Sequence, residues 1–462
     1  MNAMDSLRSS GASFSLTRRD LLEYGAVGLG ALTLVACSGP STAPKPSSSA
    51  LSGLDFSGVK PAKTIDYWTV HPASSVAVET QLVNAFNSSQ SDVQVNMVTA
   101  GANYEDVASK FQTAQAARKL PGVVMLSDVW WFRYYLNQSI IPLDSLLKHL
   151  TVDTGDYVST LYRDYNYNGA HWAVPYARST LLFYYNKTAW SNAGLPDRGP
   201  KTWDEFGGWA KKLMSSNTGS MTSAFEFNSP TDYPAWEDQN NFWAYGGEYS
   251  DKFTIDCNSA KSVAALERIR DAIYKDKWAV VSSSSAVSDL GAGATAATRN
   301  SSGNLVSLQK TARGKFDVGV AFLPGGSAGT TNVCPTGGAG LSIPAGITPE
   351  QQVAAGMFLK FMTSPENTVI FSAATGYLPV RKSADTKVLL TKTPLIETAI
   401  KQLATTRSQD WARVFLPTGD DILANAIVAV TTQNADPKAS LTAAKTQLEQ
   451  AYNTSVKPNL SK

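Results

Sequence analysis

Strand-like and helix-like runs of apolar residues follow one another along most of the chain. Short apolar or alternating runs predict strands, and apolar residues repeated every three or four positions predict helices. The first predicted elements are a strand, a helix, a strand, a helix and a strand, over residues 64–69, 75–86, 93–98, 104–118 and 122–126. Strands that alternate with helices at this spacing predict an α/β fold with mixed, mostly parallel sheets.

The same patterns continue through the later part of the chain. Strands are predicted over 172–175, 180–185 and 316–323, and helices over 203–214, with Thr202 as a suitable N-cap, and over 353–362. In open α/β sheets, ligands bind beyond the carboxyl ends of the strands. The strand ends of interest are therefore His71, Asp128 and the turn predicted over residues 177–179.

The first residues have the pattern of an export signal. Arg18 and Arg19 form a twin-arginine pair, and the apolar run over 24–36 that follows is too short to span a bilayer, which takes roughly 20 residues. The run ends in Leu-Val-Ala-Cys, which looks like a bacterial lipobox with Cys37 as the lipidated residue. We therefore expect residues 1–36 to be a twin-arginine lipoprotein signal peptide. A plain signal peptide with an incidental cysteine is the alternative.

A segment with almost no large apolar side chain follows Cys37. Residues 38–53 are mainly Ser, Pro, Ala and Gly, which cannot form a core and are typical of a flexible spacer. We expect residues 37–53 to be the lipidated cysteine and its linker, which hold the folded part at the extracytoplasmic face of the cell membrane. The remaining chain, 54–462, is long enough for two domains.

Composition narrows the range of functions. The net charge of +2 argues against an electrostatic nucleic-acid binder. No later apolar run has the length of a membrane span, so a lipid is the only membrane attachment that we expect. With Cys37 acylated, Cys257 and Cys334 remain, and the sequence leaves open whether they form a disulfide.

Aromatic residues are numerous. The 11 Trp and 18 Tyr provide flat apolar faces with a polar edge, which suit sugars, polyols and quaternary ammonium groups. Packing in the core is the commoner role for any single one of them.

The sequence has few signs of catalysis. The common motifs of zinc hydrolases, thiol redox sites, serine hydrolases and phosphate loops are missing, and His71, His149 and His171 have no nucleophile motif beside them. The glycine-rich segments 325–326 and 337–340 are interpreted as turns rather than as phosphate loops. The sequence does not exclude a pair of catalytic carboxylates, but we expect no enzyme, no cofactor and no metal.

Eight segments carry a resemblance to a known family. They are residues 68–72, 100–107, 128–132, 174–180, 193–200, 334–340, 375–381 and 412–417, and they include Gly-Gly-Ala-Gly and Gly-Tyr-Leu-Pro. In this order they resemble the extracellular solute-binding proteins of ABC importers, in the family that includes maltose-binding protein. Within it they are most similar to the glycerol-3-phosphate- and glycerophosphodiester-binding lipoproteins, above all the glycerophosphocholine-binding branch. The resemblance is weakest at 215–239, at 280–300 and in the C-terminal tail.

The resemblance implies a fold of two lobes, joined by crossing strands and hinged around a ligand cleft. Carried over to this chain, lobe one is 54–174 plus 334–373, and lobe two is 175–333 plus 374–462. The resemblance also implies a monomeric binding subunit without a nucleic-acid partner. Such a subunit passes a small polar ligand, a glycerophosphodiester or glycerol phosphate, to ABC permease subunits.

The family's ligand contacts carry over to eight positions. They are Tyr104, Asp128, Ser179, Trp236, Ser301, Gly338, Tyr377 and Arg413. Six match their motifs well, whereas Trp236 and Ser301 are placed by spacing within weaker regions, and Ser302 is an equal candidate with Ser301. Tyr233 stands at a position that varies within the family, which leaves the exact ligand open.

The residue types at these positions fit a phosphodiester. Arg413 can donate two parallel hydrogen bonds to phosphate. Ser179 and Ser301 can donate single hydroxyl bonds, and the N–H of Gly338 can approach a ligand closely because glycine has no side chain. Trp236 can stack on the glycerol or on the head group.

A positively charged head group has its own candidates. Asp128 and Tyr104 can face a choline cation, because a carboxylate and an aromatic face both attract it. Simpler roles stay open, with Arg413 as a salt-bridge residue, Asp128 as a helix cap and Tyr377 in hinge packing. At the level of function the alternatives are an oligosaccharide-binding subunit, since aromatic clefts serve both ligands, and a secreted hydrolase.

Overall fold

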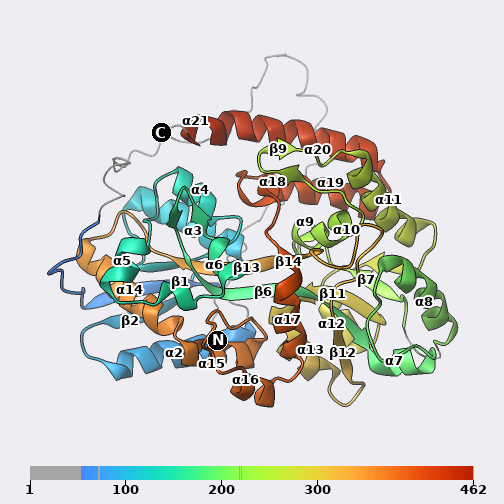
Figure 1. Ribbon diagram of the computed structural model, residues 1–462, viewed down its shortest axis with the longest axis horizontal. Helices are drawn as coiled ribbons and strands as arrows, with labels where there is room; N and C mark the ends of the chain where they lie inside the picture. The colour runs from blue at the N-terminus through green and yellow to red at the C-terminus, as the bar shows by residue number, and fades with distance from the viewer. Residues whose placement is uncertain (1–53, 71–72, 218, 220, 461–462) are drawn as a thin grey trace, which may run out of the picture. The chain divides into compact units, whose positions relative to one another are not determined.

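One continuous sheet of ten strands runs through the part of the chain that the structure describes (Figure 1). The computed structural model describes residues 54–70, 73–217, 219 and 221–460. The predicted signal peptide, Cys37, the linker and His71 lie outside them. The strand order is β10-β7-β11-β6-β13-β3-β1-β2, with β12 beside β6 and β14 beside β13. The strands are β1 Thr64–Thr69, β2 Gln94–Thr99, β3 Val123–Ser127, β6 Val174–Asn186, β7 Phe225–Phe227, β10 Ala279–Val281, β11 Ala297–Ser301, β12 Val318–Ala321, β13 Cys334–Ser342 and β14 Thr406–Arg407.

The long strand β6 belongs to two halves of this sheet. Its residues 174–180 pair with β13, which pairs in turn with β3, and its residues 181–186 pair with β11 and β12. We call β2, β1, β3 and β13 the first half of the sheet, and β11, β7, β10 and β12 the second half. The pairing of β6 with β13 therefore joins the two halves.

Two of the predicted turns are wrong. Residues 177–179 lie inside β6, and residues 337–340 lie inside β13, next to a bulge. β6 is buried all along 174–185, and the polar residues that suggested a turn are buried with the rest. A strand that is buried on both faces lacks the alternation that identifies a half-exposed strand.

Elsewhere the predicted alternation is confirmed. β1 pairs in parallel with β2 and β3, and β7 pairs in parallel with β10 and β11. The predicted helix 203–214 is α8, and its N-cap Thr202 accepts the backbone N–H of Glu205 at 3.1 Å. The predicted helix from residue 104 ends one residue early, because Arg118 takes the left-handed conformation with φ of 54°.

Helices flank both halves of the sheet (Figure 1). Those nearest the first half are α2 Ala73–Ser89, α3 Tyr104–Ala117, α4 Trp131–Leu136, α5 Asp144–His149, α6 Ser159–Arg163, α14 Pro349–Met362, α15 Pro365–Thr375 and α16 Thr386–Lys392. Those nearest the second half are α7 Lys187–Asn192, α8 Trp203–Ser215, α9 Pro234–Glu237, α10 Gln239–Ala244, α11 Ala260–Tyr274, α12 Ala286–Ala292, α13 Leu305–Ala312, α17 Ile396–Gln402, α18 Trp411–Val414, α19 Gly419–Gln433, α20 Pro437–Ala451 and α21 Lys457–Leu460. Two small hairpins are β4 Asn166–Tyr167 with β5 Ala170–His171, and β8 Ser250–Asp251 with β9 Thr254–Ile255.

The two cysteines within the described residues are not bridged to each other. Cys257 and Cys334 are buried free thiols, and their sulfur atoms contact the carbonyl oxygens of Leu441 and Leu181. In the same part of the chain, none of the helices combines the length and the apolar character that a membrane crossing needs.

Candidate ligand-binding site

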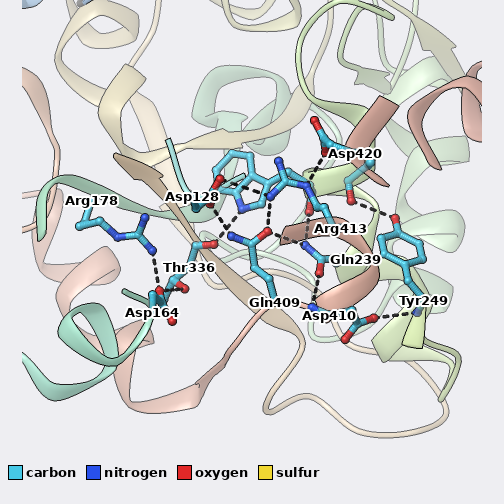
Figure 2. Close-up of polar contacts among 12 residues, drawn as sticks. Asp128, Asp164, Arg178, Gln239, Tyr249, Thr336, Gln409, Asp410, Arg413 and Asp420 are labelled. Carbon is cyan, nitrogen blue, oxygen red and sulfur yellow. Dashed lines mark hydrogen bonds and ion pairs between the residues drawn. The ribbon is translucent and has the colours of Figure 1, made fainter. Parts of the chain in front are cut away.

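A buried arginine lies at the centre of a polar network that reaches both halves of the sheet (Figure 2). Arg413 belongs to α18, and its side chain is 3% exposed. Its Nε donates to Asp420 Oδ1 at 2.6 Å, and its Nη1 lies 3.5 Å from Asp128 Oδ1. The same Nη1 donates to Gln409 Oε1. The guanidinium is therefore held from the end of β3 and from the first turn of α19.

Asp128 is the first residue after β3, at the strand end where the sequence predicts a ligand contact. Its N–H donates to the carbonyl of Gly338 at 3.0 Å. Its carboxylate accepts from Gln409 Nε2 and pairs with Arg413. The N-cap of the next helix, α4, is Trp130, which makes no side-chain cap bond. Asp128 therefore holds the arginine rather than capping α4.

Gln409 connects the two charged residues. Its Nε2 donates to Asp128, and its Oε1 accepts from Arg413 and, at 3.2 Å, from Gln239 Nε2. Gln239 accepts the backbone N–H of Asp410 at 3.0 Å, which fixes its own orientation. Neither glutamine was predicted from the sequence, because neither belongs to a recognisable motif. The single sequence signal for Gln409 is its position four residues before Arg413.

Two carboxylates share this one guanidinium. Burial lowers the pKa of Arg413, but Asp420 and Asp128 more than offset that effect, and the pKa is raised above its ordinary value. Burial raises the pKa of Asp420, against the lowering effect of Arg413. The charge of the arginine is thus already matched by protein groups, so any anion that binds this guanidinium has to take the place of one of them.

The indole of Trp236 lies beside β13. α9 carries the residue, and its Nε1 donates to the carbonyl of Thr336 at 2.9 Å. Gly337 lies directly against the ring, where an added Cβ would be 2.3 Å from Cζ2. Gly337 belongs to the segment for which a turn was predicted from the sequence. Its lack of a side chain is what lets the indole lie on the strand.

Ser179 and Gly338 lie on the two neighbouring crossing strands. Ser179 pairs with Gly337 and is 1% exposed. Gly338 has φ of 101°, and a Cβ there would be 2.0 Å from the carbonyl oxygen of Ala177, so this position requires glycine. Because its carbonyl accepts the N–H of Asp128, Gly338 connects β13 to the arginine network.

Ser301 and Ser302 lie where β11 ends. Ser301 Oγ accepts the N–H of Gly303 at 3.1 Å, and its carbonyl accepts the hydroxyl of Tyr184 at 2.9 Å. Ser302 is fully buried, and its Oγ has no hydrogen-bond partner among the described residues. Gly303 lies against the ring of Tyr377, since a Cβ there would be 2.7 Å from Cζ. Both serines therefore stay candidates.

Three tyrosines gather around the start of α3. The rings of Tyr104 and Tyr233 have centres 6.4 Å apart, and Tyr377 stacks on Phe371 at 5.6 Å. Burial, and then Tyr377 and Tyr233, raise the pKa of Tyr104, so its hydroxyl is neutral. The hydroxyl of Tyr233 donates to Glu105 Oε2 at 3.4 Å. Tyr233, the N-cap residue of α9, thus links α9 to α3.

A second buried ion pair, which was not predicted from the sequence, lies behind Ser179. Arg178 Nη2 lies 2.5 Å from Asp164 Oδ2, and Nη1 donates to the hydroxyl of Tyr165 at 3.0 Å. Thr336 Oγ1 donates to the same oxygen of Asp164 at 2.6 Å (Figure 2). Asp164 thus ties Arg178 of β6 to Thr336 of β13, where the two strands pair side by side.

The eight expected residues fall into three groups. They are Asp128, Gly338 and Arg413 in one network, Ser179 and Trp236 beside Gly337, and Tyr104, Tyr377 and Ser301 around the tyrosines and the end of β11. A guanidinium with neutral hydroxyls and aromatic faces can recognise an anion that carries a polar and an apolar part. Within the described residues, no three His, Cys, Asp or Glu are grouped so as to hold a metal.

These features belong to a known protein family. The profile of the bacterial extracellular solute-binding proteins matches residues 81–398. This chain belongs to that family. The matched range includes the crossing strands β6 and β13 and reaches both halves of the sheet, whereas β1 and α18 lie outside it. The protein is accordingly a solute-binding subunit of an ABC importer, and its place is outside the cytoplasm.

Individual relatives agree with this assignment. UgpB of Mycobacterium tuberculosis, whose crystal structure was determined in complex with glycerophosphocholine, is 40% identical, with a TM-score of 0.81 over 85% of this chain and 99% of that one. The sn-glycerol-3-phosphate-binding periplasmic protein UgpB of Escherichia coli (strain K12) is 25% identical over 70% of this chain and 75% of its own length. The resemblance to glycerophosphodiester-binding proteins is therefore confirmed.

More distant solved structures bear on the fold. The GacH receptor of Streptomyces glaucescens GLA.O is 20% identical, with a TM-score of 0.73 over 86% of this chain and all of that one. At this identity the likeness concerns the fold alone. It confirms the expected two-lobed fold with mixed sheets.

Proposed function

We propose that this solute-binding protein captures glycerophosphodiesters such as glycerophosphocholine, with sn-glycerol 3-phosphate as a related ligand. The complex of the Mycobacterium tuberculosis relative with glycerophosphocholine supports the proposal, as do the names of the Escherichia coli relatives. The observation that carries it is the buried, charged Arg413, which lies 3.5 Å from Asp128.

The pair of Arg413 and Asp128 suits a ligand that carries both signs of charge. A guanidinium forms short, charge-assisted hydrogen bonds to phosphate, so the phosphodiester takes Arg413. Asp128 then needs a new positive partner, because a buried carboxylate without one is costly. A choline group supplies that partner. We therefore expect zwitterionic glycerophosphodiesters to bind more tightly than glycerol 3-phosphate, which brings a second negative charge and no cation.

Neutral groups complete the proposed site. Tyr104 and Tyr377 have raised pKa values because they are buried, so they offer uncharged hydroxyls and aromatic faces, and such faces attract a quaternary ammonium group. Ser179 and the serines at the end of β11 can bind the glycerol hydroxyls, and Trp236 can stack on the glycerol or on the head group.

The proposal extends to the position of the protein at the membrane. We propose that residues 1–36 direct export by the twin-arginine route and that Cys37 carries the lipid. The linker over 37–53 then holds a monomeric binding protein beside its ABC permease subunits. The lobes with the boundaries expected from the sequence move about β6 and β13, and the ligand leaves chemically unchanged.

A panel of ligands tests this function. Binding to the folded state raises the melting temperature by mass action, so glycerophosphocholine should raise it, glycerol 3-phosphate should raise it less, and maltose and trehalose should not. A shift with a sugar and none with glycerophosphocholine would show an oligosaccharide-binding subunit instead. Release of choline or glycerol from glycerophosphocholine in a long incubation would show a hydrolase.

A further inference from the structure

Two aromatic residues flank Arg413, one at the start of α18 and one directly after its end. Trp411 begins α18, and Phe415 follows its last residue and donates its N–H to the carbonyl of Trp411 at 2.8 Å. α18 packs against β8 and α19, so its backbone belongs with the second half of the sheet. Phe415 is nevertheless only 8% exposed, and of the four rings that contact it, Trp411 alone comes from α18.

The ring of Phe415 is buried against the first half. Its centre lies 4.5 Å from that of Phe132, 5.7 Å from that of Trp131 and 5.7 Å from that of Tyr167. Phe132 and Trp131 belong to α4, Tyr167 belongs to β4, and Phe132 and Tyr167 are themselves 4.8 Å apart. Tilted and edge-to-face pairs at such distances are favourable. Three rings of the first half therefore surround one ring from α18.

This aromatic contact and the ion pair are coupled by the chain. Asp128 comes just before Trp131 on one segment, and Arg413 comes just before Phe415 on the other. With the ring in place, Arg413 Nη1 lies 3.5 Å from Asp128 Oδ1. A phosphate competes with Asp128 for the guanidinium of Arg413, but it does not compete with the rings of α4 and β4 for the ring of Phe415. The aromatic contact can thus persist while the ion pair is exchanged for ligand.

We propose that Phe415 is a positioning residue of the ligand site: its contact with α4 and β4 holds α18 so that Arg413 faces Asp128. The inference rests on the proposed function, because it takes Arg413 as the phosphate contact. It goes further, because it assigns part of the ligand affinity, and part of the attachment between the two halves, to a side chain that acts through Arg413.

Three variants separate this role from ordinary packing. Phe415→Ala removes the ring, whereas Phe415→Leu keeps most of the apolar volume and should rescue most of the effect. Phe253→Leu is the matched control, because Phe253 packs on Trp411 and on Tyr452, both at 4.9 Å, on the side of the second half. All three are made in the mature chain with Cys37→Ser.

The first measurement is the rate at which glycerophosphocholine dissociates, by stopped-flow fluorescence. Phe415→Ala should weaken binding about 10-fold, mostly through faster dissociation. Phe415→Leu should weaken it by about 3-fold at most, and Phe253→Leu should leave it unchanged. A Phe415→Ala protein that loses thermal stability but keeps the wild-type dissociation rate has lost only packing, and that result overturns the inference.

The second measurement needs no ligand. Nitroxide labels at Lys148→Cys in α5 and Lys211→Cys in α8 report the distance between the two halves, and both positions are exposed. Phe415→Ala should lengthen and broaden the distance distribution, and Phe253→Leu should not; an unchanged distribution overturns the inference. A wild-type protein that fails to bind glycerophosphocholine overturns the proposed function and leaves this test intact. If Phe415→Ala does not fold, Phe415→Leu and Phe415→Met take its place. Both should still change the dissociation rate and the distance distribution more than Phe253→Leu does.

Discussion

The indole of Trp236 lies on the bare backbone of Gly337, so closely that a single methyl group at that position would occupy the space of the ring. A Cβ at Gly337 would be 2.3 Å from Cζ2. The indole is also tied to the strand by its Nε1, which donates to the carbonyl of Thr336 at 2.9 Å. The absence of one side chain on β13 therefore sets the position of the aromatic face in the proposed site.

Gly337→Ala tests this relationship. The added methyl group should push the indole off the strand and weaken glycerophosphocholine binding about 10-fold, the size expected for overpacking. Gly208→Ala is the control, because Gly208 is an exposed position of α8 where a Cβ would meet no other atom, and alanine there should stabilise the helix by up to about 1 kcal/mol. Calorimetric titration that gives wild-type affinity for Gly337→Ala would contradict the placement of Trp236 in the site.

Replacing Arg413 tests the phosphate contact. Arg413→Ala should weaken glycerophosphocholine binding by about 1.5–3 kcal/mol, or roughly 10- to 150-fold. It should also lower the melting temperature, because Asp128 and Asp420 lose their buried cation. Arg413→Lys keeps the positive charge but loses the planar guanidinium. Its affinity for glycerophosphocholine should therefore lie between those of the wild type and Arg413→Ala. Unchanged affinity in Arg413→Ala, measured by calorimetry, would remove Arg413 from the site.

A second variant distinguishes affinity from stability at the same position. Adding Asp128→Asn to Arg413→Ala removes one of the unpaired carboxylates, so part of the melting temperature should return. The affinity should not return, because the phosphate still has no guanidinium. Recovery of both together would mean that Arg413 acts through folding rather than through the ligand.

A buried carboxyl group in the first half makes stability depend on pH. Glu79 in α2 is fully buried and accepts the hydroxyls of Tyr67 at 2.9 Å and Thr69 at 2.7 Å. Burial raises the pKa of Glu79 from 4.5 to about 7, against the lowering effect of these hydrogen bonds. The folded chain then holds the proton more tightly than the unfolded chain. The stability that this proton contributes is complete below about pH 4.5 and is lost as the pH rises to about 7.

Glu79→Gln should remove this dependence. The variant should melt higher than the wild type near pH 8, and the two should melt at similar temperatures near pH 4.5. Some slope should remain, because burial also raises the pKa of Glu226 to about 7 and that of Asp410 to about 6. Glu366→Gln, at an exposed position of α15, serves as the control. If the melting temperatures of wild type and Glu79→Gln differ by the same amount at every pH from 4.5 to 8, titration of Glu79 is ruled out.

Cys37→Ala tests the membrane anchor. Without the thiol no diacylglycerol can be attached, and a mature chain held by lipid alone should leave the membrane fraction after export. Fractionation of cells that express either chain, followed by immunoblotting, measures this. A Cys37→Ala protein that stays in the membrane fraction would show that the lipobox interpretation is wrong.

The alternation of strands and helices was predictable because each early element has its own periodicity. The failure at β6 has a physical cause. Arg178 lies in the middle of this buried strand, and a charged side chain in a short run indicates exposure. Arg178 instead forms an ion pair with Asp164 and donates a hydrogen bond from Nη1 to the hydroxyl of Tyr165. Both partners come from another segment of the chain. No local pattern shows that such a partner exists.

In the candidate site, too, local patterns did not reveal the contacts between distant segments. Asp128 and Arg413 were predicted through motifs of the family that the chain resembles, and Trp236 through its spacing within a weaker region. Their residue types alone left capping, salt bridges and packing open. Gln409 reaches Asp128 from 281 residues away in the sequence. Its role arises when the two halves of the sheet meet, so it belongs to the tertiary structure. Gly337 escaped notice for the opposite reason, because what matters there is a side chain that is missing.

The order of the strands bears on how the chain is made. β13 lies between β3 and β6, yet it comes long after both in the sequence. While the ribosome is still short of residue 334, β3 and β6 each lack a neighbour, and such unpaired edges promote aggregation. If the twin-arginine signal acts as proposed, only chains that have already folded are exported. Export then depends on synthesis of the chain through β13. On that proposal, a translation product that stops before residue 334 lacks β13 between β3 and β6, and it should remain in the cytoplasm for proteolysis.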